Sequence, residues 1–246
     1  MPRPFRPLAL VLPALLLGCS PVLADQVRPL GDALSAHAPD RYRADLASLS
    51  ARLHLTDEIG AVGRPGPVMD LARLHLAHGM WAEAGSLLDA LDRSALTAPD
   101  RSRWDRMRLL SALFDRTGAD PDPEELIAGQ DWPDAALFRA LSGTGSGTDL
   151  AEAADLIRSW PGPVRERALP RLLERAIGDE NWPVVRALSA QVRTLPELAG
   201  SPADLYLQGA AAERGGLPEA ALKAYEGAGE GSDFWAARAR LAWAEL

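Results

Sequence analysis

Two stretches of this sequence share one pattern: LARLHLAHGMWAEAGSLLDAL, residues Leu71–Leu91, and LYLQGAAAERGGLPEAALKAYEGA, residues Leu205–Ala228. In each stretch an apolar helical segment leads to a glycine, Gly79 or Gly216, and a second apolar helical segment follows. This pattern predicts two amphipathic helices joined by a tight turn at the glycine. One such hairpin cannot bury its own apolar face, so we expect it to stack on neighbouring hairpins.

The shared pattern resembles the tetratricopeptide repeat, a family of helix–turn–helix units. Ala84 and Ala221 occupy equivalent positions and are 137 residues apart, close to four periods of the roughly 34 residues typical of this repeat. In this family small residues lie where two helices cross closely. We therefore expect an all-α fold, organised as a right-handed α-solenoid of such hairpins, with further units between the two stretches.

Four intervening segments also show an apolar periodicity of three to four residues, which predicts helices at Arg101–Gly118, Asp149–Trp160, Val164–Ile177 and Trp182–Val192. We expect Pro170 to kink or break the third of these near Leu169, because proline clashes with the preceding helical turn. The closing segment, Phe234–Leu246, resembles the first helix of another unit. It is either a capping helix or a truncated unit.

The first 24 residues have the features of an export signal. Two arginines precede the apolar run Leu8–Leu17, and Ala24 is the kind of small residue found before a cleavage site. The run is too short to cross a bilayer, which takes about 20 residues. The sequence Leu16–Cys19 also resembles a bacterial lipobox, in which Cys19 would carry a lipid. We therefore expect a periplasmic or secreted protein or, alternatively, one anchored to the envelope membrane through Cys19.

A Gly- and Ser-rich stretch, SGTGSGT at Ser142–Thr148, lies between helical segments. No lysine follows it and no strand precedes it, so a phosphate-binding loop is disfavoured. Alternating glycine and serine favour a flexible linker. We therefore expect an N-terminal helical lobe over residues 25–142, a linker over residues 143–148, and a C-terminal helical lobe over residues 149–246.

The charge of the chain disfavours nucleic acid as a partner. The whole chain has a net charge of −8. Removing the two arginines of the signal segment leaves 24 basic residues against 34 acidic ones, a net charge of about −10. Binding to nucleic acid normally needs a basic face that neutralises phosphates. Because Cys19 is the only cysteine, no intramolecular disulfide is expected.

Catalytic and metal-binding motifs are absent from the sequence, which has no HExxH, CxxC, GxSxG or Asp-rich calcium loop. His75 and His78 lie three residues apart on one predicted helix, close enough to share a metal. In the repeat that this stretch resembles, however, a packed aromatic side chain usually takes the position of His75. We therefore expect this pair to be structural, with no metal and no cofactor.

Two classes of function are compatible with these features. The first is an exported, non-catalytic adaptor whose helical surface binds an envelope protein or a peptide. The alternative is the accessory superhelical region of a cell-wall enzyme similar to the soluble lytic transglycosylases, with its catalytic domain outside this chain. Membrane association is expected only through a lipid on Cys19.

The resemblance implies that the inner face of each first helix lines a binding groove. Carried over by position, the groove residues are Met69, Arg73, Leu76 and Ala77 in the first stretch and Tyr206, Ala210, Glu213 and Arg214 in the second. We expect Arg73, Tyr206 and Arg214 to contact the partner, because Arg and Tyr are enriched at binding hot spots. Met69 and Arg73 stand where some family members have the Lys and Asn that hold a C-terminal carboxylate. A carboxylate clamp is therefore not expected.

Overall fold

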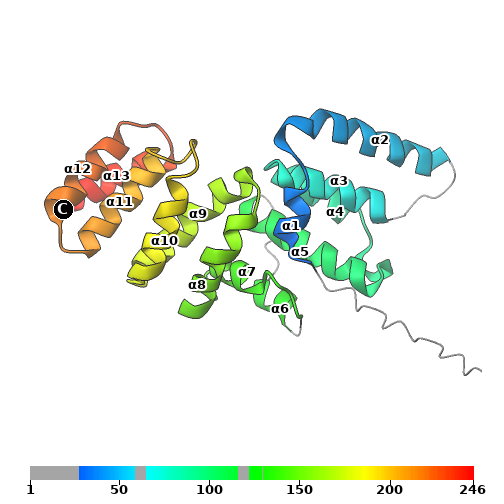
Figure 1. Cartoon of the computed structure of the whole chain (residues 1–246), viewed down its shortest axis with the longest axis horizontal. Helices are drawn as coiled ribbons and strands as arrows, with labels where there is room; N and C mark the ends of the chain where they lie inside the picture. The colour runs from blue at the N-terminus through cyan, green and yellow to red at the C-terminus, as the bar shows by residue number, and fades with distance from the viewer. Residues whose placement is uncertain (1–27, 59–64, 116–121, 129) are drawn as a thin grey trace, which may run out of the picture.

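The computed structural model describes residues 28–58, 65–115, 122–128 and 130–246. Their secondary structure is helical, with no strand in these ranges, which confirms the all-α fold class. The helices form an elongated array with α1–α5 in one half and α10–α13 in the other (Figure 1). Within the same ranges, no helix has the length and apolarity that a bilayer crossing needs. The predicted signal segment and Cys19 lie outside the described residues.

The α-helices are α1 Leu30–Ser35, α2 Tyr42–Glu58, α3 Pro65–Ala77, α4 Trp81–Asp89, α5 Ala98–Phe114, α6 Pro123–Ile127, α7 Ala135–Ser142, α8 Gly147–Leu156, α9 Gly162–Gly178, α10 Trp182–Val192, α11 Pro202–Arg214, α12 Pro218–Gly229 and α13 Phe234–Glu245. Short 3₁₀ helices lie at Pro39–Arg41, Arg93–Ala95 and Ile157–Ser159. The helices predicted from periodicity are therefore present as α5, α8, α9, α10 and α13. α5 ends at Phe114, before the predicted end at Gly118, which lies outside the described residues, and α8 ends at Leu156 and continues as a 3₁₀ helix.

The two hairpins predicted from the repeated pattern are α3–α4 and α11–α12. Each turns at a glycine with a positive φ angle, 76° at Gly79 and 73° at Gly216. The next N–H group then donates to the carbonyl five residues earlier, from Met80 to His75 and from Leu217 to Ala212, both at 2.9 Å. This closure is the Schellman turn that ends many helices. The predicted glycine turns are confirmed.

A third hairpin, α9–α10, uses the same turn without a glycine. Asn181 donates its N–H to the Ala176 carbonyl at 2.9 Å, and the left-handed position is taken by Glu180, with a φ of 52°. A side chain in this region costs about 1–2 kcal/mol relative to the right-handed conformation. The turn therefore forms because the packing of α9 on α10 outweighs the local strain.

Close helix crossings occur where the sequence places a glycine. A Cβ atom on Gly209 would lie 2.6 Å from the ring of Tyr225, and one on Gly85 would lie 2.7 Å from Ser111 Oγ. These glycines therefore let α11 approach α12 and let α4 approach α5. The expected role of small residues at helix crossings is confirmed at both places.

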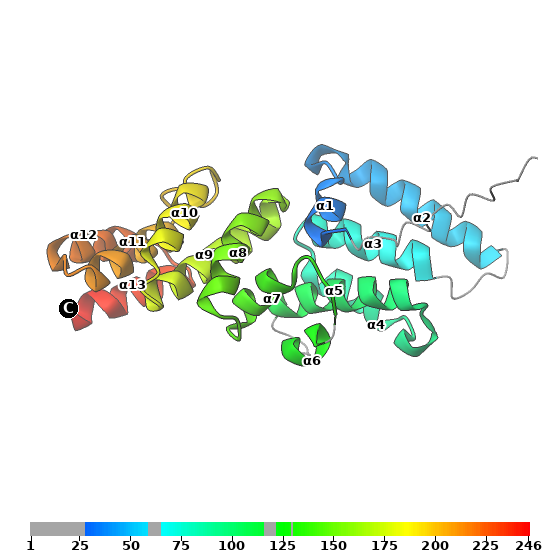
Figure 2. The ribbon, with the colours of Figure 1, turned by 60° about the horizontal axis from the view of Figure 1, so that its bottom comes forward.

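One buried apolar cluster runs from α1 to α13 and crosses the expected boundary between the two lobes. A second, smaller cluster of Leu49, Leu71 and Leu74 holds α2 against α3. Both views show α2 lying alongside α3 at one end of the array (Figures 1 and 2). The position of α2 therefore depends on a small number of apolar contacts.

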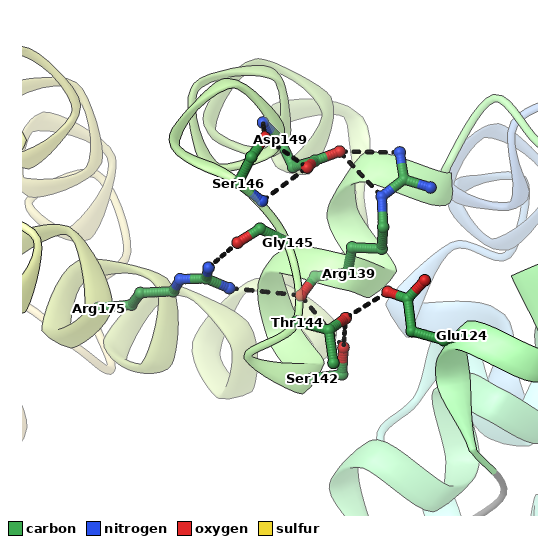
Figure 3. Close-up of polar contacts among 8 residues, drawn as sticks. All are labelled: Glu124, Arg139, Ser142, Thr144, Gly145, Ser146, Asp149 and Arg175. Atoms are coloured by element: carbon green, nitrogen blue, oxygen red, sulfur yellow. Dashed lines mark hydrogen bonds and ion pairs between the residues drawn. The ribbon is translucent and has the colours of Figure 1, made fainter.

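The Gly- and Ser-rich stretch differs from the flexible linker that we expected. Gly147 and Thr148 begin α8, and the four residues before them form a short connection held by polar contacts (Figure 3). Thr144 Oγ1 donates to Glu124 at 2.6 Å, and the Arg175 guanidinium donates to the Gly145 carbonyl. These bonds tie the connection to α6 and α9, and no break in packing separates α7 from α8.

The N-terminus of α8 has a capping box. The Ser146 hydroxyl accepts from the Asp149 N–H, and the Asp149 carboxylate accepts from the Ser146 N–H at 2.7 Å. Arg139 of α7 donates to the same carboxylate at 2.9 Å. Hydrogen bonding by Ser146 is the largest of the effects that lower the pKa of Asp149 to about 2, with Arg139 adding to it.

Of the kink or break expected at Pro170, the break does not occur, because α9 continues as one helix from Gly162 to Gly178. Pro170 is buried in its middle, and its neighbours Leu169 and Leu172 are core residues. Proline removes one hydrogen bond from the helix. Burial of the surrounding apolar side chains offsets this loss.

Replacing Glu180 with glycine should stabilise the protein, because glycine adopts the left-handed conformation without strain. We expect Glu180→Gly to raise the free energy of unfolding by about 0.5–1 kcal/mol, after allowing for the greater chain entropy of glycine. Gly216→Ala at the equivalent turn should lower the free energy of unfolding by about 1 kcal/mol, because alanine is strained in the left-handed conformation. No steric clash adds to this cost, since nothing lies within 4 Å of the new methyl group. Urea unfolding measures both changes. A destabilised Glu180→Gly variant would contradict the shared turn.

The stabilising effect of Asp149 should depend on pH in a defined way. Its folded-state pKa of about 2 lies below the ordinary value of 3.8, so its contribution is present above pH 4 and is lost as the pH falls toward 2. We expect Asp149→Asn to cost about 1 kcal/mol at pH 7, typical of a lost cap, and progressively less below pH 4. Asp155→Asn, on the exposed side of α8, is the control. An Asp149 effect that does not change with pH would exclude the carboxylate as the cause.

Candidate functional site

A shallow groove of about 500 Å³ lies over the α3–α4 hairpin. Its lining comes from two residues of α3 and five of the α4 segment: Leu71, His75, Ala82, Glu83, Ser86, Leu87 and Ala90. We call this surface the α3–α4 groove. It is open to solvent and joins an apolar lining to a few polar groups.

The floor and the rim of the α3–α4 groove differ in character. Leu71 is buried and Leu87 is half-buried, and both pack against the small cluster that holds α2. The α4 side presents Ala82, Ser86 and Ala90, which are exposed and spaced by four residues. This spacing places the three small side chains on one side of the α4 segment. The groove therefore offers an apolar floor and a side that another backbone can approach closely.

His75 is the main polar group of the floor and contacts two side chains from outside the lining. The Tyr42 hydroxyl of α2 lies 3.3 Å from His75 Nδ1 and 3.0 Å from the sulfur of Met80. Burial lowers the pKa of His75, and the nearby Glu83 carboxylate partly opposes this effect. The imidazole of His75 is therefore neutral at pH 7, where it can act as a lone-pair donor or as an N–H donor.

The other two histidines near α2 complete this polar junction. The His78 and Tyr42 rings are 4.7 Å apart between centroids, and His37 Nδ1 lies 3.4 Å from an Asp45 oxygen. Burial, followed by the charge of His37, lowers the pKa of His78. The His75–His78 pair is thus part of the packing between α2 and α3. Within the described ranges, no three His, Cys, Asp or Glu side chains group as a metal site.

The inner-face residues expected from α3 do not form an open groove. Met69 and Leu76 are 1% and 0% exposed, and Ala77 is also buried, so their side chains cannot reach a ligand. Arg73 is half-buried and forms an ion pair with Asp70 at 3.1 Å. We expected this face of α3 to contact a partner. For its apolar residues this expectation is corrected, because they are buried in the core.

The inner face of α3 is filled by the chain itself. α1 packs on α3, and its Leu30 and Leu34 are buried in the same cluster as Met69 and Leu76. The Leu30 N–H donates to Asp134 Oδ2 at 2.7 Å.

Further contacts fix α1 in this place. Trp160 lies so close to Gly31 that a Cβ there would be 2.5 Å from the indole. Asp134 pairs with Arg106 at 3.4 Å, and both side chains are buried. Burial raises the pKa of Asp134 and lowers that of Arg106, while each partner opposes the shift of the other. α1 could not be predicted from the sequence, because a six-residue helix carries almost no periodic signal.

The expected residues of α11 divide between the core and the surface. Tyr206 is 9% exposed and packs against Tyr225 and Trp235, with ring centroids 5.7 and 5.5 Å away. The Arg238 guanidinium covers its ring at 4.6 Å. Tyr206 is therefore a packing residue, which corrects its expected role as a contact for a partner. Ala210 is partly buried and packs against the same core.

Glu213 and Arg214 are exposed at the end of α11. Glu213 accepts a hydrogen bond from the Tyr225 hydroxyl at 2.6 Å, and Arg214 donates to the Gly178 carbonyl at 3.5 Å. They lie in the half of the array opposite to α3 (Figure 1). The structure therefore does not gather the eight expected residues into one site.

Comparisons with known proteins give no further guide to the site. A scan against protein-family models, a search of curated proteins and a search of solved structures each found no match.

Proposed function

We propose that this protein is an exported, non-catalytic adaptor that binds a segment of another envelope protein in the α3–α4 groove. We further propose that its hairpins form a right-handed, TPR-like α-solenoid. Support for this architecture comes from the three hairpins that share one turn geometry, at Gly79, Glu180 and Gly216. Export is supported by the apolar run and the small residue near position 24 of the sequence.

The observation that carries the binding proposal is the exposed small face of α4 beside an apolar floor. Ala82, Ser86 and Ala90 let a partner backbone come close, while Leu71 and Leu87 accept its apolar side chains. Amphipathic helices bind to grooves in this manner, with apolar anchors three or four residues apart. Glu83 at the rim favours a partner segment that carries a basic residue near these anchors.

A photo-crosslinking amino acid at position 86 tests the groove directly. Introduced in place of Ser86 and expressed in the producing bacterium, it should give discrete adducts with a partner protein. The same amino acid in place of Ala151 is the control, because Ala151 is also exposed in the middle of a helix, on α8. Equal adducts from both positions would exclude the groove as the binding surface.

A blocking variant then measures the contribution of the groove to affinity. Ala90→Arg places a long charged side chain over the apolar floor, and a loss of 1.4 kcal/mol of binding free energy corresponds to about a tenfold weaker complex. We expect at least this loss for the partner captured at position 86. Ala151→Arg should leave the affinity unchanged. Both residues are exposed, so the melting temperatures should stay close to that of the wild type.

A further inference from the structure

Three different donor atoms meet at the junction of α2 with the α3–α4 turn. Tyr42 Oη lies 3.0 Å from Met80 Sδ and 3.3 Å from His75 Nδ1, and the nitrogen and the sulfur are themselves 3.3 Å apart. The backbone fixes two of these residues relative to each other, because the Met80 N–H donates to the His75 carbonyl at 2.9 Å in the Schellman turn. The three atoms therefore form a compact triangle that the fold holds in place.

The triangle holds few protons for its number of acceptors. A thioether sulfur has no proton, and a neutral imidazole carries one on only one of its two nitrogens. In the tautomer with the proton on Nε2, the single Tyr42 hydroxyl proton serves both His75 Nδ1 and Met80 Sδ. In the other tautomer the Nδ1 proton can donate to Met80 Sδ. The three contacts are then ordinary hydrogen bonds, and a cation that bound here would replace them with bonds to the nitrogen and the sulfur of the Nε2-protonated form.

The donor set selects a particular class of cation. Thioether sulfur is a soft ligand that favours Cu(I), and imidazole nitrogen also binds copper well, whereas Mg²⁺ and Ca²⁺ prefer oxygen. With the bond lengths of zinc as a guide, about 2.0 Å to nitrogen and 2.3 Å to sulfur, the 3.3 Å separation corresponds to an N–metal–S angle of about 100°. A bent arrangement of this kind leaves a third position for Tyr42 Oη.

We propose that His75 Nδ1 and Met80 Sδ bind one soft monovalent cation, Cu(I) by chemical class, with Tyr42 Oη closing the third side of the site. His75 is half-buried and lines the α3–α4 groove, so an ion from solvent can reach the imidazole. The site uses His75 with a thioether from the turn. It therefore differs from a site made by the His75–His78 pair.

Metal titration with matched variants tests this site. The full chain is used with Cys19→Ser, because Cys19 is the only thiol and would compete for Cu(I). Anaerobic titration of Cu(I) against a chromophoric chelator at pH 7 should give one bound ion per chain. His75→Gln and Met80→Leu should each weaken binding by at least about tenfold, in line with the usual effect of losing a contact at a metal site.

The controls carry the same substitutions elsewhere in the fold. His54→Gln, on an exposed position of α2, and Met69→Leu, in the core, should leave the affinity unchanged. Circular dichroism checks that each variant is folded, and Met80→Leu conserves volume. Among the four methionines, the methyl resonance of Met80 should move most when Cu(I) is added.

Three results would overturn the proposal. The first is the absence of Cu(I) binding by the folded protein at micromolar concentration. The second is binding that survives both His75→Gln and Met80→Leu. The third is tighter binding of Zn²⁺ than of Cu(I) with no dependence on Met80, because this would show a site made of nitrogen and oxygen ligands.

Discussion

The closeness of neighbouring helices is the constraint on which the rest of this structure depends. At Gly209 and Gly85 the space that a Cβ atom would occupy is already filled by a side chain of the next helix. Because Gly209 has no side chain, Tyr225 can lie against the backbone of α11 with 1% of its surface exposed. Its hydroxyl then reaches Glu213 at 2.6 Å. The crossing at Gly209 closes the α11–α12 hairpin, and the crossing at Gly85 joins the α3–α4 hairpin to α5.

A second constraint acts where the N-terminal part of the array meets its centre. α1 fills the face of α3 that a repeat protein would leave open, and a buried carboxylate fixes its first N–H group. Asp134 can stay buried because it accepts from Leu30 and pairs with Arg106. The open surface of the α3–α4 hairpin is therefore the opposite one, which α4 lines with small residues. The α3–α4 groove is therefore the surface of this hairpin on which a partner could bind.

Much of the fold could be predicted from the sequence, because most of its helices carry a periodic apolar signal. α2, at Tyr42–Glu58, was not predicted although it is as long as α5 and α9. Gly79 and Gly216 marked two turns correctly, and the segment Trp182–Val192 coincides with α10. The turn at Glu180 carried no glycine and was found only through the helices on either side. The continuous helix at Pro170 and the bonded connection at residues 143–148 could not be predicted from local propensity, because burial and hydrogen bonds outweigh it there.

The candidate site was far less predictable than the fold. Assigning Met69, Leu76 and Tyr206 to a groove required knowledge of what covers each helix, and that depends on α1 and α13, whose contacts are distant in sequence. The junction of Tyr42, His75 and Met80 could not be predicted for the same reason, because it forms only where α2 packs against the α3–α4 turn. Periodicity identifies the apolar side of a helix. It does not identify the segment that will cover that side.

Urea unfolding of two helical glycine variants tests the role of close crossing most directly. Gly209→Ala would place a methyl group 2.6 Å from the Tyr225 ring, whereas the nearest atom to a methyl at Gly227, in the neighbouring helix, is an ordinary 3.6 Å away. Alanine favours a helix over glycine by about 1 kcal/mol, so Gly227→Ala should stabilise the protein by up to this amount. Gly209→Ala should instead destabilise it by about 1–3 kcal/mol through overpacking. Equal stabilisation by both substitutions would contradict the account, because α11 and α12 would then not depend on a glycine contact.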